Sequence, residues 1–303
     1  MNRTRMKTLG IRSNFLGIDT QHSAFDSSAV VILPAPYEAT VSYGGGTKHG
    51  PAAILKASHF VEFYDEETGR DISQELGIAT LPPLAFAKKK DQAALAMLER
   101  TVSSLLERDK FVVTLGGEHT ISSAVIAAHA KRLPNLSVVQ FDAHSDLRDS
   151  YQGNRFSHAS VMARVAEFLD PRRIVQVGIR AQCEEEARFI QEKKVNTFYA
   201  HALRDGRYTT SRSNWSDAVV SCLSENVYIT FDVDGFDPSV MPSTGTPEPN
   251  GLYWSETMEC LRKIGRQKKI VGFDVVELAP LKGLSHPDLT TAKLVSKILN
   301  YAL

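Results

Sequence analysis

The sequence predicts an α/β fold in which helices cover a mainly parallel β-sheet. Short apolar runs rich in β-branched residues alternate along the chain with longer stretches of helical character, a pattern typical of strand and helix repeats around a parallel sheet. No linker rich in Gly, Pro or Ser divides the 303 residues, and no internal repeat is visible. Residues 1–303 are therefore expected to form a single domain.

Seven apolar runs have the length and composition of buried strands. They are residues 29–33, 111–115, 136–141, 173–177, 195–199, 227–231 and 270–275. Residues 91–107 place their apolar side chains on one broad stripe, and residues 289–303 repeat this helical periodicity. The sequence thus predicts strands separated by amphipathic helices.

The overall charge and the cysteines exclude several classes of protein. Lys and Arg number 35 and Asp and Glu also number 35, whereas a nucleic-acid-binding protein of this size normally carries a basic surplus. Cys183, Cys222 and Cys260 form no C-x-x-C pair, which argues against a disulfide framework and a structural zinc module. We expect no nucleic-acid partner and a reducing compartment.

The chain shows no sign of membrane association. Its longest strongly apolar run, residues 29–33, is far too short to cross a bilayer, and the first residues lack the apolar segment of a signal peptide. Basic residues from Arg3 to Arg12 precede the first acid, Asp19, as in an organellar presequence, but a simple flexible start is the interpretation that we favour. We expect a cytoplasmic protein.

The densest chemical signal follows the run at 136–141 and reads Asp-Ala-His-Ser-Asp. In an extended segment, alternate side chains point the same way, so Asp142, His144 and Asp146 would converge at the carboxyl end of a strand. Two carboxylates and an imidazole so placed can bind a metal ion. The alternative is that Asp146 starts a turn or helix while His144 is a hydrogen-bonded core residue.

A second strand-like run, residues 227–231, also ends in acids spaced by two, Asp232 and Asp234. An EF-hand loop is excluded because Gly235 comes too early in the loop. A nucleotide-binding loop is excluded as well, because the glycines at 45–50 are followed by Pro51 and Ala52 instead of Lys and Ser or Thr.

A third run, residues 111–115, leads into Gly116, Gly117, Glu118 and His119. The paired glycines permit a sharp exit from the strand and a close approach of backbone. A single His at such a place is more often structural, but open α/β sheets bind ligands at the carboxyl ends of their strands. The combined candidate ligands are His119, Asp142, His144, Asp146, Asp232 and Asp234.

Six ligand groups exceed what one ion needs when water must also coordinate, so a two-metal cluster is expected. Four carboxylates and two imidazoles without a thiolate suit a fairly hard divalent ion in near-octahedral geometry. Mn²⁺ fits this set best, with Zn²⁺ as the alternative.

These motifs resemble those of the ureohydrolase (arginase/agmatinase) family. The likeness rests on Gly-Gly-Glu-His at 116–119, Asp-Ala-His-Ser-Asp at 142–146 and Asp-Val-Asp-Gly-Phe-Asp-Pro at 232–238, and it extends to Gly-Thr-Pro-Glu-Pro at 245–249 and Asp-Val-Val-Glu at 274–277. The resemblance implies a three-layer α/β/α fold of the arginase type with a roughly eight-stranded sheet. It also implies two Mn²⁺ per subunit, hydrolysis of a small guanidino substrate to urea and an amine, and assembly as a homo-trimer or homo-hexamer.

The resemblance also assigns roles within the site. His119, Asp142, Asp146 and Asp232 would hold one ion, and His144, Asp142, Asp232 and Asp234 the other. Asp234 would also orient the hydroxide that bridges the two ions, and Glu277 would bind the substrate guanidinium. His158 would carry a proton to the departing amine, a task that suits a side chain titrating near neutrality. Without the resemblance, Glu277 could simply pair with a surface cation and His158 could be a half-exposed residue at a helix start.

The substrate is predicted to be agmatine. Arginases follow the Asp-x-His-x-Asp motif with an Asn that helps to bind the α-carboxylate, whereas this chain continues with Leu147, Arg148 and Asp149, as the agmatinase branch does. Asn250 departs from the family, which usually has Gly there, but Asn tolerates the positive φ of a turn. Arg148 and Arg155 could instead favour a substrate with a carboxylate, such as guanidinobutyrate.

Three other interpretations compete with an agmatinase-like hydrolase. The first is another ureohydrolase, acting on arginine, guanidinobutyrate, guanidine or a formimino compound. The second is a metal-binding relative without turnover, which the intact ligands argue against. The third is a two-metal phosphohydrolase, which would be expected to carry cationic groups beside its metals.

Overall fold

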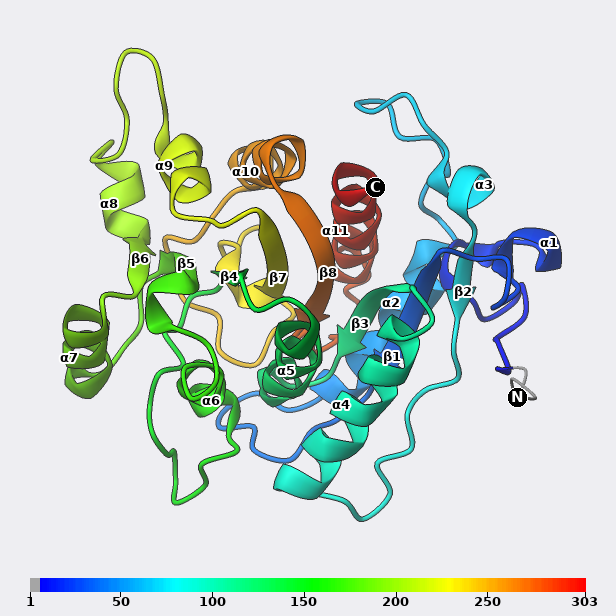
Figure 1. Ribbon diagram of the computed structural model, residues 1–303, viewed down its shortest axis with the longest axis horizontal. Helices are drawn as coiled ribbons and strands as arrows, with labels where there is room; N and C mark the ends of the chain where they lie inside the picture. Colours follow the sequence, from blue (N-terminus) through cyan, green and yellow to red (C-terminus); the bar gives the residue numbers. More distant parts are fainter. Residues whose placement is uncertain (1–5) are drawn as a thin grey trace.

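A computed structural model describes residues 6–303 of the chain. The described part is built on one eight-stranded sheet in which every pairing is parallel (Figure 1). The strand order is β2-β1-β3-β8-β7-β4-β5-β6. The strands are β1 (Val30–Ala35), β2 (Ile78–Thr80), β3 (Phe111–Gly116), β4 (Leu136–Phe141), β5 (Ile174–Ile179), β6 (Asn196–Tyr199), β7 (Asn226–Asp232) and β8 (Lys269–Val276).

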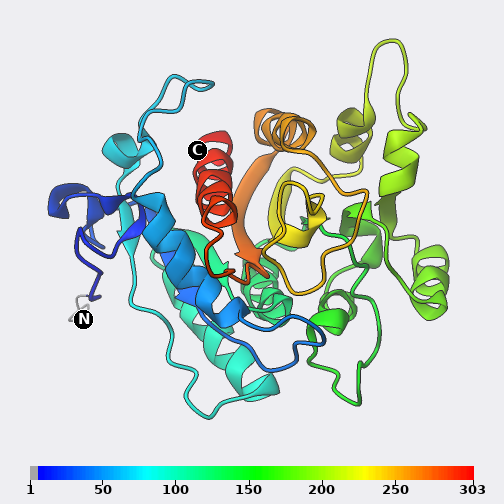
Figure 2. The same ribbon diagram turned by 180° about the vertical axis from the view of Figure 1, so that it is seen from behind.

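Helices cover both faces of the sheet, as Figures 1 and 2 show. On one face α2, α11, α10 and α9 pack in that order, and on the other α4, α5 and α6 do. The α-helices are α1 (Thr20–Ser23), α2 (Gly50–Ser58), α3 (Ile72–Leu76), α4 (Asp91–Leu106), α5 (Ser122–Arg132), α6 (Val161–Val165), α7 (Glu184–Lys193), α8 (Ala200–Arg204), α9 (Trp215–Ser221), α10 (Trp254–Gln267) and α11 (His286–Ala302). The short 3-10 helices are η1 (Phe15–Gly17), η2 (Thr47–His49), η3 (His119–Ile121), η4 (His158–Ser160), η5 (Pro171–Arg173) and η6 (Val233–Gly235).

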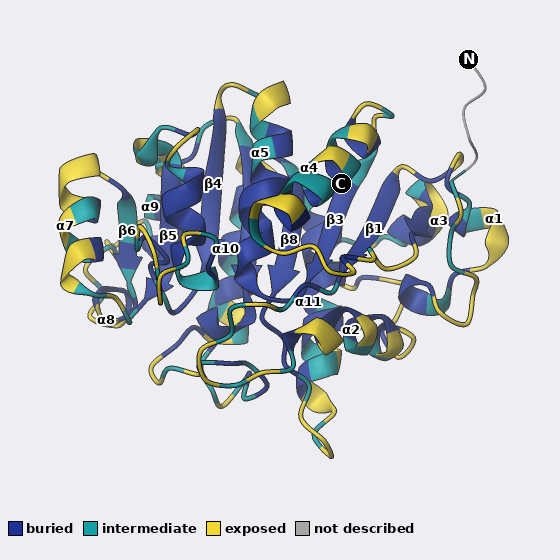
Figure 3. Cartoon of the chain, turned by 90° about the horizontal axis from the view of Figure 1, so that it is seen from below, coloured by how far each residue is buried: buried dark blue, intermediate teal, exposed yellow. Residues whose placement is uncertain are grey.

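The strands supply two hydrophobic cores, one on each face of the sheet. Because side chains alternate along a strand, β3 places Val113 and Leu115 in one core and Val112 in the other. Figure 3 shows the strands buried and the helices exposed only on their outer surfaces. Within the described residues, no helix is both long enough and apolar enough to cross a membrane.

The structure confirms the predicted fold class, and seven of its eight strands lie within two residues of the predicted runs. The sequence missed β2, because three residues paired only to β1 carry too short a pattern to recognise. Helix α11 begins at His286, three residues before the predicted start, with Pro287 in its first turn, where proline is favoured. The flexible start expected around Arg3 and Arg5 lies outside the described residues, and the assignment of residues 1–303 to one domain stays a prediction.

The candidate ligands converge because four neighbouring strands end together. Leu115 of β3, Val275 of β8, Phe231 of β7 and Phe141 of β4 pair in one row across the sheet. The residues that follow this row come from segments far apart in the sequence, yet they emerge side by side at one edge of the sheet.

The glycine pair after β3 makes the close approach that the sequence predicts. A Cβ on Gly117 would lie 1.9 Å from the carbonyl oxygen of Tyr37, where no side chain fits. The next residue donates its backbone N–H to that same oxygen. Gly117 therefore holds the exit of β3 against the loop that follows β1.

Candidate metal centre

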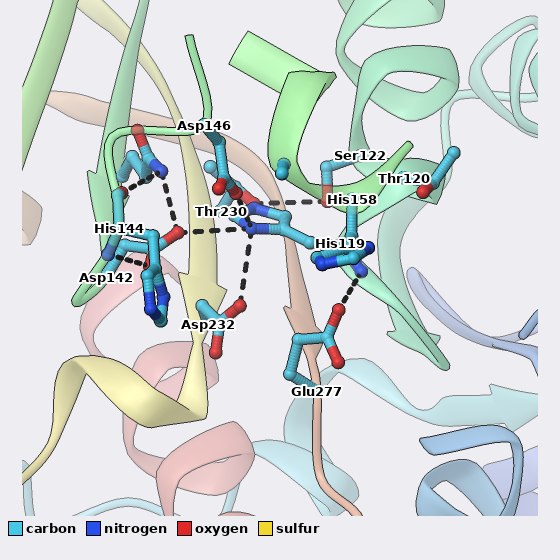
Figure 4. A network of polar contacts seen from close by, with 12 residues as sticks. His119, Thr120, Ser122, Asp142, His144, Asp146, His158, Thr230, Asp232 and Glu277 are labelled. Carbon is cyan, nitrogen blue, oxygen red and sulfur yellow. Dashed lines mark hydrogen bonds and ion pairs between the residues drawn. The ribbon is translucent and has the colours of Figure 1, made fainter. Parts of the chain in front are cut away.

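The first cluster of ligand groups surrounds His119, which begins η3 just after β3. Its Nδ1 lies 3.1 Å from Asp142 Oδ2, 3.0 Å from Asp146 Oδ2 and 3.3 Å from Asp232 Oδ2 (Figure 4). All four residues are buried. Three carboxylate oxygens thus converge on one imidazole nitrogen.

The second cluster shares Asp142 with the first. His144 Nδ1 lies 3.0 Å from Asp234 Oδ2 and 3.6 Å from Asp142 Oδ1. Asp142 therefore presents one oxygen to each histidine, and its carboxylate is held by the His144 backbone N–H, which donates to Oδ1 over 2.6 Å, and by Gln140 Nε2, which donates to Oδ2 over 2.7 Å. A carboxylate between two clusters is the arrangement in which one side chain bridges two ions.

The route by which these residues meet differs from the expected one. Strand β4 ends at Phe141, and His144 still forms an isolated parallel bridge with Ala181, but the extended backbone does not reach Asp146. Asp146 has a φ of 53°, and this left-handed backbone turns its side chain toward His119 while His144 faces Asp234. The left-handed backbone at Asp146 redirects the chain there, and no helix begins at this residue, so only the helix form of the alternative is wrong.

A buried hydrogen-bond chain fixes the tautomer of His119. Thr230 Oγ1 donates to Asp274 Oδ1 over 2.8 Å and lies 2.9 Å from His119 Nε2. Because the hydroxyl proton points to the carboxylate, its oxygen accepts the Nε2 proton of His119. Nδ1 faces the three carboxylates and has no aligned hydrogen-bond partner among the described residues. Burial opposes the charged form of His119, but Asp142, Asp146 and Asp232 outweigh it and raise the pKa of the ring well above its usual value, so a proton or a metal ion is required at Nδ1.

This orphaned nitrogen fits a metal ion. A lone pair that faces three carboxylate oxygens is repelled by each of them unless a cation lies between. Oxygen and imidazole ligands without a thiolate suit a hard divalent ion. His119, Asp142, Asp146 and Asp232 would hold one ion, and Asp142, His144, Asp232 and Asp234 the second.

The pKa values of the candidate ligands also indicate a site for cations. Burial, followed by the charge of Asp142, raises the pKa of Asp146 to about 7. Burial also raises the pKa of Asp232 well above its usual range, with Asp234 adding to the effect. At His144 burial opposes the charged form, but Asp234 and Asp142 outweigh it and raise the pKa to about 12. The centre is therefore crowded with negative charge and attracts cations.

Glu277 lies at the same edge of the sheet, directly after β8. Its Oε1 accepts the backbone N–H of His119 over 2.6 Å (Figure 4). The residue is 8% exposed and has a φ of 64°, a conformation that costs free energy and is often found at functional sites. Burial raises the pKa of its carboxyl group well above the usual range. The alternative of a surface ion pair is wrong for Glu277.

His158 is the first residue of η4, with the Ser157 hydroxyl accepting a backbone N–H in the cap. It does stand at a helix start, but its ring also lines the cleft above the centre. Burial, followed by the positive charges of His119 and His144, lowers the pKa of His158 to about 4. This value lies below the near-neutral one expected for a proton carrier, and it leaves the ring neutral and able to accept a proton at pH 7.

The cleft has a volume of about 400 Å³ and is lined by both acidic and basic residues. Arg180 donates to the backbone carbonyls of Asp234, Phe236 and Glu248 and so ties together the loops of its wall. Arg148 lies 3.7 Å from Glu186 and stacks over the Tyr151 ring. The remaining lining residues are Ser42, His144, Asp146, His158, Ala159, Ala181, Gln182 and Thr246.

The sequence alone did not reveal the residues that form hydrogen bonds behind the candidate ligands. Thr230 and Asp274 lie inside buried strands, and Gln140 lies just before the end of another. Polar residues within apolar strand runs are a usable signal, because a buried polar group needs a partner. Their partners come from other strands, so the sequence alone does not show which group each one serves.

His129 on α5 lies behind this network and gives a pH-dependent prediction. Its ring packs against Tyr228, 4.7 Å between centroids, and Tyr228 donates to Asp274 over 2.9 Å. Burial lowers the pKa of His129 to about 4. Since the unfolded chain binds this proton at a higher pH, the free energy of unfolding falls as pH drops from about 6.5 toward 4, by about 3 kcal/mol from this group.

Urea unfolding of the wild type and of His129→Gln between pH 4 and 8 measures the effect of that group. The variant is expected to lose part of the wild-type slope between pH 4 and 6.5. Equal slopes in the two proteins would show that the folded state does not depress the pKa of His129.

Comparison with known proteins assigns this geometry to a family. The sequence profile of the Arginase family matches residues 28–303. The chain belongs to the arginase family. This family comprises binuclear metal hydrolases, so the chain is an arginase-family hydrolase, and the two-metal phosphohydrolase is excluded.

Relatives within the arginase family lie on its agmatinase side. The chain is 41% identical over 285 residues to N(1)-aminopropylagmatine ureohydrolase of Synechocystis sp., covering 92% of this chain and 90% of the relative. It is 34% identical over 283 residues to agmatinase of Bacillus cereus, covering 92% and 93%. The crystal structure of agmatine ureohydrolase of Thermoplasma volcanium superposes with a TM-score of 0.82 at 29% identity, covering 98% of this chain and 94% of the other. This arginase-family hydrolase is thus a ureohydrolase of the agmatinase type.

Proposed function

We propose that the protein hydrolyses the guanidino group of agmatine, releasing urea and putrescine. The observation that carries this proposal is a cleft in which, among the described residues, the lining Glu248 makes no ion pair while the lining Arg148 and Arg180 are engaged by other groups. Such a cleft suits a substrate that is positively charged at both ends.

The wall of the cleft argues against a substrate with a carboxylate tail. The Arg180 guanidinium already donates to backbone carbonyls, and Arg148 pairs with Glu186. Arg155 pairs with Asp149 and Glu167 and does not line the cleft. By contrast, Glu248 lines the cleft, and its carboxylate makes no ion pair with any residue of 6–303. This acid is placed to bind an ammonium group.

The reaction that we propose needs a strong nucleophile near neutral pH, because a guanidinium is stabilised by delocalisation and stays protonated. When bound, two Mn²⁺ ions lower the pKa of a coordinated water from about 16 to about 7. Asp234 would orient that water, and Glu277 would bind the guanidinium so that its carbon faces the attacking oxygen. His158, neutral at pH 7, takes up the proton and passes it to the departing amine.

A second substrate is favoured by the comparisons. The 41% identical relative is an N(1)-aminopropylagmatine ureohydrolase, and so is a 36% identical protein of Thermus thermophilus. Agmatine extended by an aminopropyl group keeps the guanidino group and places a further ammonium toward the outer cleft. We propose this compound as the alternative substrate, with the aminopropyl derivative of putrescine as its product.

A urea-release assay on the Mn²⁺-loaded protein separates these substrates. We expect kcat/KM for agmatine or N(1)-aminopropylagmatine to exceed that for arginine, 4-guanidinobutyrate and guanidine by at least about tenfold, since one ion pair is worth about 1.4 kcal/mol or more at a desolvated site. Arginine or guanidinobutyrate as the best substrate would overturn the proposed specificity. No urea release from any of the five compounds would favour a metal-binding relative without turnover.

Glu248→Gln tests the ammonium site by itself. Removing this carboxylate is expected to raise KM for agmatine about five- to tenfold and to change kcat little, because the tail contact is the same in ground and transition states. Glu185→Gln, an exposed change on α7 outside this cleft, serves as the matched control. Unchanged KM in Glu248→Gln would assign tail binding to another residue.

We also propose the metal, the assembly and the location of the protein. Manganese is preferred over zinc because four carboxylates and two imidazoles form a mainly oxygen donor set. Assembly as a homo-trimer or homo-hexamer and a cytoplasmic location are proposed from the family likeness. Metal analysis, light scattering and cell fractionation test them in turn.

A further inference from the structure

Glu118 is a fully buried carboxylate beside the centre, and its neighbours account for its hydrogen bonds. Oε2 accepts the backbone N–H groups of Ala39, over 2.5 Å, and Thr40, over 2.7 Å. Oε1 accepts the hydroxyls of Thr40, over 2.8 Å, and Thr120, over 2.6 Å. Glu118 does not line the cleft, so its carboxylate acts on the cleft only through the groups that it holds.

Thr40 connects Glu118 to His158. It lies in the loop that follows β1, and this loop passes close to η4, 118 residues further along the chain (Figure 2). The Thr40 Oγ1 accepts the backbone N–H of His158 over 3.1 Å and lies 3.2 Å from the ring Nδ1. The same hydroxyl therefore contacts both the backbone and the ring of His158.

The hydrogen-bond capacity of a hydroxyl decides which ring nitrogen carries the proton. A hydroxyl has one proton to donate and two lone pairs to accept with. The proton of Thr40 points to Glu118, and one lone pair is taken by the His158 backbone N–H. Thr40 thus has only a lone pair left for the ring, and a proton on His158 Nδ1 satisfies this contact of 3.2 Å. The Ser157 hydroxyl lies further from the same nitrogen, at 3.4 Å, and its oxygen can also accept. Nε2 is then free to accept a proton and has only the Ser42 hydroxyl near it, at 3.4 Å.

We propose that Thr40, anchored by Glu118, is a positioning residue that fixes the proton of His158 on Nδ1 and presents Nε2 to the cleft. This inference rests on the proposed function, in which His158 moves a proton from the attacking water to the departing amine. With the opposite tautomer, Nε2 would already carry a proton and could not accept another. The contact to Glu118 also favours the ring once it is protonated, because the polarised hydroxyl accepts more strongly.

Two substitutions at one position test the proposal in the Mn²⁺-loaded enzyme. Thr40→Val keeps the shape but removes the hydroxyl. We expect kcat to fall about ten- to a hundredfold, part of the roughly 10²–10⁴-fold that a general acid or base contributes, with KM changed less than about threefold. Thr40→Ser restores the hydroxyl and is expected to keep kcat within about threefold of wild type. A loss of kcat in both variants, or in neither, would overturn the proposal.

The same pair is made in a His158→Ala background to exclude a general structural effect. If Thr40 acts through His158, Thr40→Val changes kcat there less than about twofold, because the group that it positions is gone. An equal loss in both backgrounds would overturn the proposal. Thermal melting and metal content of each variant show that fold and metal loading are intact.

A spectroscopic measurement remains decisive even where the wild type releases no urea. Protein with ¹⁵N-labelled histidine, loaded with diamagnetic Mg²⁺, gives ring nitrogen signals that distinguish the tautomers, and the signals lost in His158→Gln identify those of His158. We expect an Nδ1–H ring in the wild type and Thr40→Ser and a changed tautomer in Thr40→Val. An Nε2–H ring in the wild type would overturn the positioning role. Inactivity together with the expected tautomer would count against the proposed function alone.

Discussion

Replacing Asp234 by Asn is expected to lower kcat by at least about 10²–10³-fold while the fold stays intact. The carboxylate accepts the Ala143 backbone N–H over 3.0 Å and faces His144 over 3.0 Å. An amide of the same shape keeps the packing, but it removes one of the negative charges that hold the second ion and orient the nucleophile. Steady-state urea release, with circular dichroism and thermal melting as checks on the fold, measures the effect.

Asp237→Asn is the matched control for that experiment. It is the same change three residues further along, and its carboxylate binds Ser239 and the Gly251 backbone N–H without contacting either cluster. Its kcat is expected to stay within about threefold of wild type. Near-normal turnover in Asp234→Asn, or an equal loss in the control, would count against the role given to Asp234.

Removing divalent ions is expected to abolish urea release and to lower the melting temperature. Without metal ions, the buried carboxylates of the two clusters repel one another, and only protons, such as one on His119 Nδ1, offset their charge. Ions at about a thousand times their dissociation constant stabilise the folded state by about 4 kcal/mol per site. Dialysis against a chelator, followed by Mn²⁺ titration in a calorimeter and a melting assay, should find two ions per chain.

Mn²⁺ binding is also expected to release protons and to tighten as pH rises. The ion displaces protons from groups such as Asp146, with a pKa of about 7, and His144, with a pKa of about 12. Lowering pH therefore favours protons over Mn²⁺ at these ligands. Titration in buffers of different ionisation enthalpy counts the protons. A stoichiometry of one ion, or affinity independent of pH between 6 and 8, would contradict the two-cluster assignment.

The sequence was sufficient for the fold class and for placing the candidate ligands at one edge of the sheet. Parallel strands buried on both faces read as continuous apolar runs, and seven of them were recognised because their pattern is local. Asp142 and Asp232 follow such runs directly and His119 comes shortly after one, and the carboxyl end of a parallel strand is where open α/β sheets bind ligands. The Asn250 turn was also predictable, since its φ of 65° is one that Asn tolerates.

The three-residue strand β2 and the side-chain directions at 142–146 could not be predicted in the same way. The first pattern is too short, and the second depends on a left-handed backbone at Asp146 that sequence periodicity does not report. Nor could the sequence show that Arg155 pairs with Asp149 and Glu167. Because Arg155 does not line the cleft, its suggested part in binding a substrate carboxylate is wrong.

By itself, then, the sequence named the candidate ligands, because donor type and the ends of apolar runs are properties of short segments. The tertiary structure decided which of them meet. The order β3-β8-β7-β4 brings four strand ends from distant parts of the chain to one edge. It also puts Thr230 and Asp274 behind His119, and Thr40 and Glu118 behind His158. Such pairings depend on strand order and on loop paths, and these are fixed by the packing of the whole sheet between its two helical layers.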